Sequence, residues 1–377
     1  MKKFKLMQIV PALNSGGVEQ GAIDVANYLA EYENNSIVVS SGGRLIEDLN
    51  KKYIFHYKLS VNSKNFLKMP FIAKKINKII KEKKINILHI RSRAPAWLLP
   101  YIDKKELITI STFHNLYNHQ NIIKKIYNKG LAKTDYIVAI SKYVGEEIIK
   151  QYKISKKKIT IINRGIDIDF YNAKKPEETE LINFINKKKI DSNKKNILFP
   201  GRLTEWKGQL EFLKIIEKFK DQSYQFYFAG DDKNVSYTKK LINQIEKKKL
   251  DQNCKILGHL NNNDLKMMYY CSDLVISAPL RAEGFGRIIS ESLAMKKIVI
   301  AYNFGGVKDQ LKDLNEIYKI IPFDQEELKK RIQLILDSPN ENFEKIKYYG
   351  REHVIKYFSK KQMLKKYYNL YKDVSFE

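Results

Sequence analysis

The sequence has too few cysteines for a disulfide framework or a thiolate metal site, and it has no apolar run long enough for a membrane span. It contains two cysteines, Cys254 and Cys271, and their spacing matches no metal motif. This scarcity fits a reducing compartment and argues against a thiolate metal site. No apolar run approaches the roughly twenty residues of a spanning helix, and the N-terminus lacks the long apolar segment of a cleavable signal. We therefore expect a cytoplasmic protein, or one held peripherally on the inner face of the cytoplasmic membrane.

Acidic residues are also in deficit. The chain of 377 residues has 42 Asp and Glu against 69 Lys and Arg, which gives a formal net charge of +27. This charge exceeds what solubility requires, so anionic partners are expected. The abundance of Lys, Asn and Ile also looks like nucleotide-composition bias, under which part of the charge has no function. Both explanations stay open.

The most informative stretch, 274–309, combines apolar runs with glycine turns. LVISAP (274–279) is rich in β-branched residues, which predicts a buried parallel strand, and the turn 283–286 follows it before a helical pattern. Glycines let the backbone turn sharply and approach a ligand closely. The helix start would present free N–H groups and a partial positive charge, which suit a phosphate or a sugar hydroxyl.

A second glycine turn follows the strand pattern of residues 196–200. Gly201 is followed by Arg202 and Lys207, two cations five residues apart, before another helical pattern. Binding a diphosphate requires this combination of positive charge and backbone amides. Two solvated cations are the alternative, and the flanking glycines argue against it.

These two stretches resemble the motifs of one enzyme family. AEGFG (282–286) followed by SESLA (290–294) looks like the E-x7-E signature of the retaining glycosyltransferases of family 4, and GRLTEWKG (201–208) is similar to their G-R-L-x-x-x-K-G motif. The resemblance implies that Glu283 contacts the donor sugar and Glu291 the nucleotide ribose. Taken alone, such a pair of acids would be ordinary surface residues.

Two further motifs in the first half of the chain follow strand patterns, RSRAPAW (91–97) and TFHNLYN (112–118). Ligands of open α/β sheets bind at such strand ends. The combination looks like the acceptor domain of lipopolysaccharide-core mannosyltransferases of family 4. This implies that Arg91 and Arg93 face an anionic acceptor, for which the planar arginine fork is suited, and that His114 holds the donor sugar or the acceptor. A structural ion pair and a loop histidine with its hydrogen bonds satisfied are the alternatives.

The length is long for one hydrophobic core and comfortable for two domains. We expect an α/β protein with the GT-B architecture that the resemblance implies, in which two Rossmann-like parallel-sheet domains face a cleft and a C-terminal helix crosses back to the first domain. The expected ranges are an acceptor-binding domain at 1–173, a linker at 174–195, a donor-binding domain at 196–352 and the returning helix at 353–377.

The resemblance implies retaining transfer of mannose or another hexose from a nucleotide-diphosphate donor to a lipid-linked or lipopolysaccharide-core glycan at the membrane. It implies no cofactor and no metal, since the nucleotide-sugar is a substrate. The alternatives are a non-catalytic protein that binds anionic glycans and an epimerase or phosphorylase of the same architecture. The expected site residues are Glu283, Arg202, Lys207 and His114 for catalysis, Gly16, Gly17, Gly201, Gly284, Phe285, Gly286 and Glu291 for donor binding, and Arg91 and Arg93 for acceptor binding.

One basic stretch, residues 64–84, has apolar residues at helical spacing among its lysines, which predicts an amphipathic helix. Either it is an ordinary outer helix of an α/β domain, or it binds anionic lipid headgroups. Nucleic acid is not expected as a partner, because no groove-reading motif or stacking platform accompanies the charge. The apolar residues of this stretch are Phe66, Leu67, Phe71, Ile72, Ile76, Ile79 and Ile80.

Overall fold

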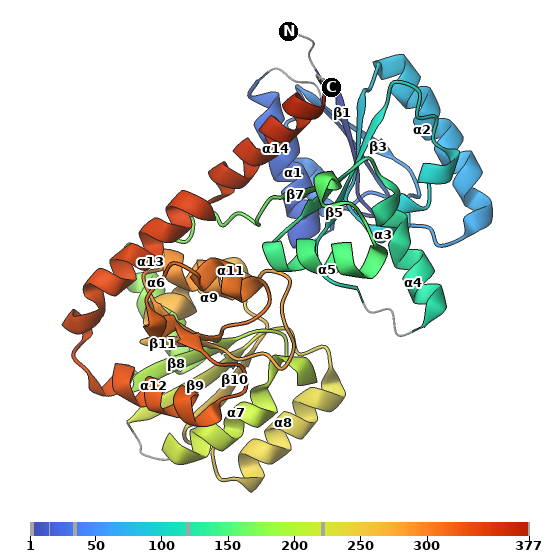
Figure 1. Cartoon of the computed structure of the whole chain (residues 1–377). Helices are drawn as coiled ribbons and strands as arrows, with labels where there is room; N and C mark the ends of the chain where they lie inside the picture. The colour runs from blue at the N-terminus through green and yellow to red at the C-terminus, as the bar shows by residue number, and fades with distance from the viewer. Residues whose placement is uncertain (1–3, 15, 33–35, 118–120, 220–222, 376–377) are drawn as a thin grey trace. The chain divides into compact units, whose positions relative to one another are not determined.

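The computed structural model describes residues 4–14, 16–32, 36–117, 121–219 and 223–375. The chain divides into two compact units (Figure 1). Unit 1 comprises Met1–Gly165 and Lys361–Glu377, and unit 2 comprises Ile166–Lys360. Each unit is a parallel sheet with helices packed against it. The predicted pair of Rossmann-like parallel-sheet domains is therefore confirmed.

Unit 1 is built on a seven-stranded parallel sheet of order β3-β2-β1-β4-β5-β6-β7. Strands covered on both faces read as continuous apolar runs, and all five residues of β2 are buried. Its strands are β1 (Leu6–Ile9), β2 (Ser36–Ser40), β3 (Ile54–Lys58), β4 (Ile87–Ile90), β5 (Ile108–Phe113), β6 (Tyr136–Ala139) and β7 (Ile159–Ile161). Its helices are α1 (Gly17–Ala30), α2 (Met69–Lys83), α3 (Arg93–Ala96), α4 (Ile122–Lys129), α5 (Lys142–Tyr152) and α14 (Lys360–Val374).

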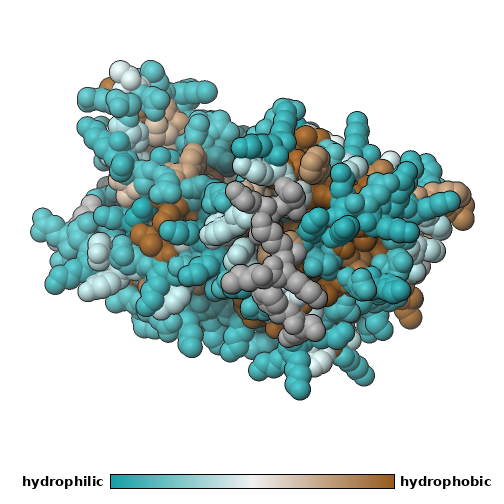
Figure 2. All heavy atoms as spheres, turned by 90° about the horizontal axis from the view of Figure 1, so that it is seen from above, coloured by the Kyte–Doolittle hydropathy of each residue, from teal (hydrophilic) through white to brown (hydrophobic). Residues whose placement is uncertain are grey.

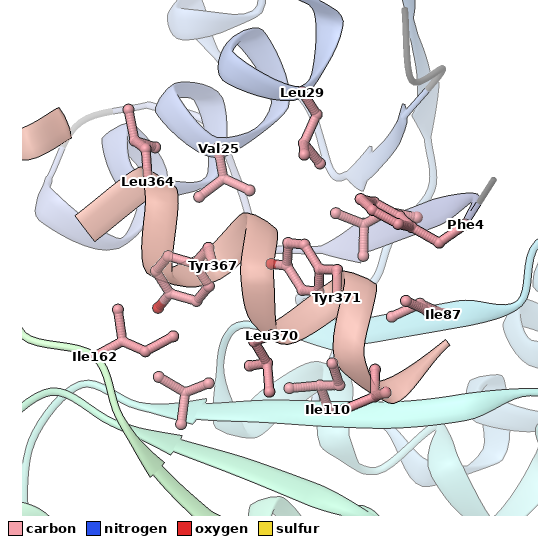
Figure 3. Close-up of a cluster of buried hydrophobic side chains, with 13 residues drawn as sticks. Phe4, Val25, Leu29, Ile87, Ile110, Ile162, Leu364, Tyr367, Leu370 and Tyr371 are labelled. Atoms are coloured by element: carbon pink, nitrogen blue, oxygen red, sulfur yellow. The ribbon is translucent and has the colours of Figure 1, made fainter. Parts of the chain in front are cut away.

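The last helix, α14, belongs to the core of unit 1. Its apolar face packs on β1, α1 and the neighbouring strands, and Tyr371 lies in the middle of this cluster (Figure 3). The hydroxyl of Tyr371 also lies 2.7 Å from Nδ1 of the buried His89, whose Nε2 lies 2.7 Å from Thr112 Oγ1. The C-terminal helix thus completes the first unit, as the expected architecture requires.

Unit 2 is built on a six-stranded parallel sheet of order β10-β9-β8-β11-β12-β13. Its strands are β8 (Lys195–Pro200), β9 (Tyr224–Ala229), β10 (Cys254–Gly258), β11 (Leu274–Ser277), β12 (Ile298–Tyr302) and β13 (Lys319–Ile320). Its helices are α6 (Glu178–Lys188), α7 (Gln209–Ile216), α8 (Val235–Lys247), α9 (Asn262–Cys271), α10 (Arg287–Ala294), α11 (Gly306–Leu311), α12 (Gln325–Asp337) and α13 (Glu344–Tyr357).

Two features differ from the sequence-based expectation. The edge strands β3 and β13 were not predicted, because β3 is only half buried and β13 has two residues. The stretch expected to be a linker, 174–195, contains α6, which packs near α9 and buries Phe184.

The surface seen in Figure 2 is mostly hydrophilic, with hydrophobic side chains in separate groups, as the high lysine content leads one to expect.

Candidate active site

The strand order of unit 2 brings the two phosphate-type motifs together. Strands β8 and β11 are neighbours, and the chain leaves β8 toward β9 on one side while β11 lies on the other. At such a switch point the loops after the two adjacent strands diverge, and ligands of open α/β sheets bind between them. The loop 201–208 follows β8 and the turn 283–286 follows β11. Motifs about eighty residues apart in sequence therefore share one edge of the sheet.

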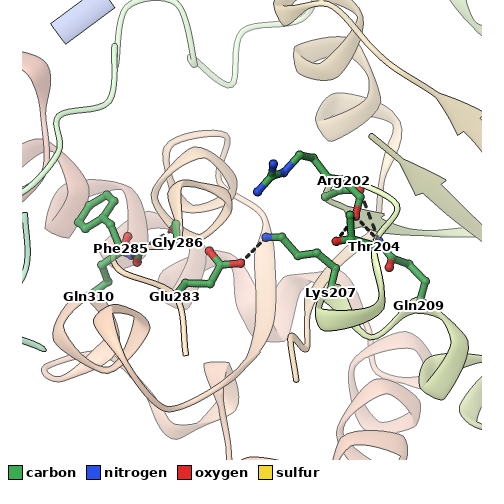
Figure 4. A network of polar contacts seen from close by, with 9 residues as sticks. Arg202, Thr204, Lys207, Gln209, Glu283, Phe285, Gly286 and Gln310 are labelled. Atoms are coloured by element: carbon green, nitrogen blue, oxygen red, sulfur yellow. Dashed lines mark hydrogen bonds and ion pairs between the residues drawn. The ribbon is translucent and has the colours of Figure 1, made fainter. Parts of the chain in front are cut away.

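An ion pair joins these two loops. Lys207 Nζ contacts Glu283 Oε1, and both side chains are 11% exposed (Figure 4). Away from bulk water such a pair is screened little, so an anionic ligand would compete with Glu283 for the ammonium group. Arg202 is exposed, and no ion pair or hydrogen bond reaches its guanidinium from any residue that the structure describes. In Figure 4 the Arg202 side chain extends toward the Glu283 turn.

Buried hydrogen bonds of Gln209 hold the loop 201–208 in place. Its Nε2 donates to Arg202 O at 3.1 Å, and its Oε1 accepts from the Tyr237 hydroxyl at 3.2 Å. Gln209 is fully buried, so these bonds are protected from water. Gly208 adopts a φ of 85°, which favours glycine at the start of α7. The backbone that carries Arg202 and Lys207 is thereby fixed.

Gln310 of α11 holds the second turn and was not predicted from the sequence. Its Nε2 donates to Phe285 O and, at 3.1 Å, to Gly286 O, while Ser290 Oγ donates to its Oε1. Gln310 is fully buried, and no motif marks it. The side chain of Phe285 is also buried and packs on Phe358 at 5.8 Å between ring centroids. Buried contacts with Gln310 and Phe358 therefore fix the conformation of the turn 283–286.

The start of α10 adds backbone donors to this turn. Gly286 precedes the helix with a φ of 83°, and the first N–H groups of a helix have no intrahelical acceptors. These groups carry partial positive charge and suit an anion. Within the described ranges no three His, Cys, Asp or Glu side chains gather as metal ligands. The protein's own positive charge here comes from Arg202, Lys207 and α10.

Glu291 lies farther along α10 and is 4% exposed. Its Oε2 accepts from the Tyr269 hydroxyl at 3.0 Å, and its Oε1 lies 2.8 Å from Arg287 Nη2. The carboxylate raises the pKa of Arg287, and burial raises the pKa of Tyr269 well above its usual value. Both partners therefore stay protonated, and each directs a proton at the Glu291 carboxylate.

The two arginines predicted to bind the acceptor occupy different environments in unit 1. Arg91 is 1% exposed; its Nη2 donates to Gly21 O at 2.5 Å and its guanidinium lies 5.0 Å from the ring centre of Tyr367. Arg93 is half-buried, lies 4.1 Å from the ring centre of Tyr117 and donates from Nη1 to Asn128 Oδ1 at 2.9 Å. Arg91 thus lies inside the unit, whereas Arg93 lies closer to its surface.

His114 follows β5 and faces Arg164, which lies after β7. Arg164 Nη2 lies 3.2 Å from His114 Nδ1, so Nδ1 accepts and the proton of the neutral ring is on Nε2. His114 Nε2 is buried and has no partner among the residues described. The predicted Gly16 and Gly17 stand at the start of α1, where Gly16 has a φ of 122°. Asn118, in the same motif as His114, lies outside the described residues.

Comparison with known proteins gives a consistent result. The model "Glycosyltransferase Family 4" matches residues 15–170 and the model "Glycosyl transferases group 1" matches residues 182–353. The crystal structure of a glycosyltransferase from Rickettsia africae ESF-5 is 35% identical, covers 99% of each chain and superposes with a TM-score of 0.88. The chain belongs to the glycosyltransferases. Both sequence motifs and fold point to this one family.

Two further proteins are similar to this glycosyltransferase over most of its length. The capsular polysaccharide biosynthesis glycosyltransferase CapH of Staphylococcus aureus is 24% identical over 86% of this chain and 87% of its own. The structure of Anabaena Alr3699/HepE in complex with UDP and glucose is 17% identical, covers 98% of this chain and all of its own, and has a TM-score of 0.79. At that identity the likeness concerns the fold, and it confirms the predicted GT-B architecture.

The basic stretch 64–84 of the glycosyltransferase forms a short 3-10 turn, Phe66–Lys68, and helix α2. The aliphatic face of α2 is not available to a membrane, because Ile72, Ile76 and Ile79 are buried in unit 1. Within the part of the chain that the structure describes, no helix is long and apolar enough to cross a bilayer. The exposed apolar residues of this stretch lie only at its N-terminal end.

The buried histidines of unit 1 make its stability depend on pH. Burial holds the pKa of His89 and of His114 well below the usual value, whereas in the unfolded chain each titrates near pH 6.5. Below that pH the unfolded state binds protons that the folded state does not, so stability falls as pH falls. Each histidine contributes up to about 1.4 kcal/mol per pH unit.

We expect unfolding of unit 1 to require less denaturant at about pH 5.5 than at about pH 7.5. In a Trp206→Phe background, Trp97 is the remaining tryptophan and its fluorescence reports on unit 1. His89→Gln combined with His114→Gln should flatten the pH dependence, whereas His259→Gln, at an exposed position, should leave it unchanged. An equal slope in all three proteins would contradict this assignment.

Proposed function

We propose that this glycosyltransferase moves mannose or another hexose, with retention of configuration and without a bound metal, from a nucleotide-diphosphate donor to a lipid-linked or lipopolysaccharide-core glycan. One observation carries the proposal: the buried Lys207–Glu283 pair stands beside the exposed Arg202 at the start of α10. A diphosphate needs two cations and backbone donors in such an arrangement. The family resemblance supports the retaining outcome.

The donor diphosphate takes the place of Glu283 beside Lys207. Its oxygens then lie against Lys207, Arg202 and the first N–H groups of α10, which stabilise the negative charge that grows as the sugar–phosphate bond breaks. Glu283, released from the lysine, accepts hydrogen bonds from sugar hydroxyls and orients the ring. The presence of UDP and glucose in the Anabaena relative supports this class of donor.

The acceptor binds to unit 1 in this proposal. Arg93 presents its guanidinium near the surface, and Arg91 contributes positive charge from inside the unit. When the acceptor opens access to the buried Nε2 of His114, this group donates its proton to a sugar hydroxyl. The capsule-related function in the name of the Staphylococcus aureus relative supports a glycan of the cell envelope as the acceptor. Transfer from anomerically pure nucleotide-sugars to an envelope glycan, with the product linkage assigned by NMR, tests the proposal; an inverted product would reject retention.

Glu291 is proposed to accept hydrogen bonds from the nucleotide ribose. Since a hydrogen bond to a charged group contributes about 1.5–3 kcal/mol, Glu291→Ala should weaken nucleotide binding roughly tenfold or more. Isothermal calorimetry with the nucleoside diphosphate measures this affinity. Glu246→Ala, at an exposed acid of unit 2, is the matched control. Unchanged affinity in a folded Glu291→Ala variant would rule out the ribose contact.

A further inference from the structure

Two separate elements of unit 1 carry apolar side chains that its core does not use. Beside the start of α2, Leu67 is 81% exposed and Phe71 is 73% exposed. On α4, Ile122 is 74% exposed and Ile126 is 55% exposed. The two isoleucines are four residues apart and therefore lie on one face of the helix. Side chains of this size are exposed in such groups mainly where they meet a partner or a membrane.

A row of aromatic rings joins these elements into one surface. The ring of Phe66 lies 5.1 Å from that of Trp97, and Trp97 stacks on Tyr127 of α4 at 5.9 Å, between ring centroids. Trp97 Nε1 also donates to Tyr127 O at 3.3 Å. Helices α2, α3 and α4 lie on the same flank of unit 1 in Figure 1. We call the exposed residues from 64–75 and 122–129 the α2–α4 surface.

The charge of the α2–α4 surface has one sign. No Asp or Glu occurs between residues 49 and 81 or between residues 107 and 134. The lysines within 64–75 and 122–129 are exposed and have no acid in their own stretch, so their ammonium groups surround the apolar side chains. The Lys78–Glu82 pair lies farther along α2. The exposed lysines are Lys64, Lys68, Lys74, Lys75, Lys124, Lys125 and Lys129.

We propose that the α2–α4 surface binds an anionic lipid bilayer, with Leu67, Phe71, Ile122 and Ile126 entering the headgroup region and the lysines contacting lipid phosphates. Apolar side chains ringed by lysine and interfacial Trp and Tyr match the layered chemistry of a bilayer surface. A second copy of the chain fits poorly, since a two-fold contact would bring lysines against lysines. Nucleic acid fits less well, because three of these four apolar side chains, Leu67, Ile122 and Ile126, are aliphatic and give bases no ring to stack on.

Membrane binding by this surface would bring the enzyme to a lipid-linked acceptor, and this link alone rests on the proposed function. The ring row continues from the surface to Arg93, whose guanidinium lies 5.8 Å from the ring centre of Tyr127. A bilayer at the α2–α4 surface would therefore lie next to the arginine proposed for the acceptor. Vesicle binding itself needs neither donor nor acceptor, so its outcome is independent of sugar transfer.

The test is sedimentation of the full-length protein with phosphatidylcholine vesicles that contain or lack phosphatidylglycerol, at low and high salt. We expect binding only to the anionic vesicles and release by salt. Ile122→Gln with Ile126→Gln, and Lys124→Gln with Lys125→Gln, should each weaken binding on the order of tenfold. The matched controls are Leu334→Gln, at a residue 55% exposed on α12, and Lys239→Gln with Lys240→Gln on α8.

Each outcome decides the inference. Loss of binding in the α2–α4 variants alone, with unchanged thermal unfolding and nucleotide binding, supports it. Failure of the wild type to sediment with anionic vesicles at low salt overturns it, as does equal binding by all variants. Concentration-dependent self-association that the same variants abolish would assign the surface to a second copy instead. Inactive protein that still binds vesicles through this surface would reject the proposed sugar transfer and leave the lipid site standing.

Discussion

Replacing Lys207 by Ala is expected to lower the rate of sugar transfer by a factor on the order of 100 to 1,000. Lys207 is 9% exposed, so its charge acts where water screens it little. The substitution removes charge stabilisation from the leaving diphosphate and leaves the carboxylate of Glu283 without its lysine. The rate at saturating nucleotide-sugar is the measurement, and thermal unfolding reports the loss of stability separately.

A matched set of variants separates catalysis from packing. Lys233→Ala removes a lysine of the same unit whose side chain is 90% exposed, and it should keep the wild-type rate. If the Lys207–Glu283 pair were only structural, Lys207→Ala combined with Glu283→Gln would restore both stability and rate. We expect it to restore stability and leave transfer slow. A wild-type rate in Lys207→Ala would remove this lysine from the site.

Gly306→Ala is expected to abolish measurable transfer and to lower the free energy of unfolding of unit 2 by about 3 kcal/mol or more. A Cβ on Gly306 would lie 2.2 Å from Gly284 O and 2.6 Å from Gly284 C, which are backbone atoms of the turn. Gly306 N also donates to Glu283 O at 2.8 Å. The turn must therefore move away from α11, and Glu283 moves with it.

Gly21→Ala is the matched control, because a Cβ there meets its nearest atom, Arg91 Nη2, at an ordinary 3.7 Å. This variant should fold and transfer normally. Calorimetry with the nucleoside diphosphate shows whether folded Gly306→Ala has lost its donor site. Wild-type transfer by Gly306→Ala would mean that the turn tolerates displacement and that close packing by α11 is not required.

The sequence predicts the central strands well because their burial is visible in their composition. Strands β2 and β11 are buried along their whole length and contain unbroken apolar runs at 37–39 and 274–276. The edge strand β3 has the sequence IFHYK with only its first residue buried, so no run distinguishes it. Edge strands depend on a neighbour for their hydrogen bonds, and that neighbour is not visible in the local pattern.

Helix ends were harder to predict, because lysine often takes the place that glycine usually marks. Lys84, Lys153 and Lys189 end α2, α5 and α6 in the left-handed conformation. Lys296, which follows α10, also has a positive φ of 54°. Each such residue costs roughly 1–2 kcal/mol that a glycine would avoid. The composition of this chain thus hides a signal on which helix prediction relies.

The contacts of the candidate site are predictable where its residues form motifs and unpredictable where the supporting residue is distant in sequence. Arg202, Lys207 and Glu283 belong to recognisable motifs, and the strand order brings Lys207 and Glu283 into contact. Gln310 supports the turn from another helix with no motif around it. Arg91 is likewise covered by Tyr367 of α14, a helix at the C-terminal end of the chain that packs into the core of unit 1. Such long-range partners appear only in the folded structure.

The most direct test of the donor site is a thermal-shift measurement of the wild type and of the Arg202→Ala, Lys207→Ala double variant with GDP, UDP and ADP, each with and without EDTA. A ligand that binds only the folded state raises the unfolding temperature. We predict that one nucleotide stabilises the wild type, that EDTA leaves this shift unchanged, and that the double variant loses it. No shift with any nucleotide, or an equal shift in the double variant, would contradict a diphosphate site between these loops.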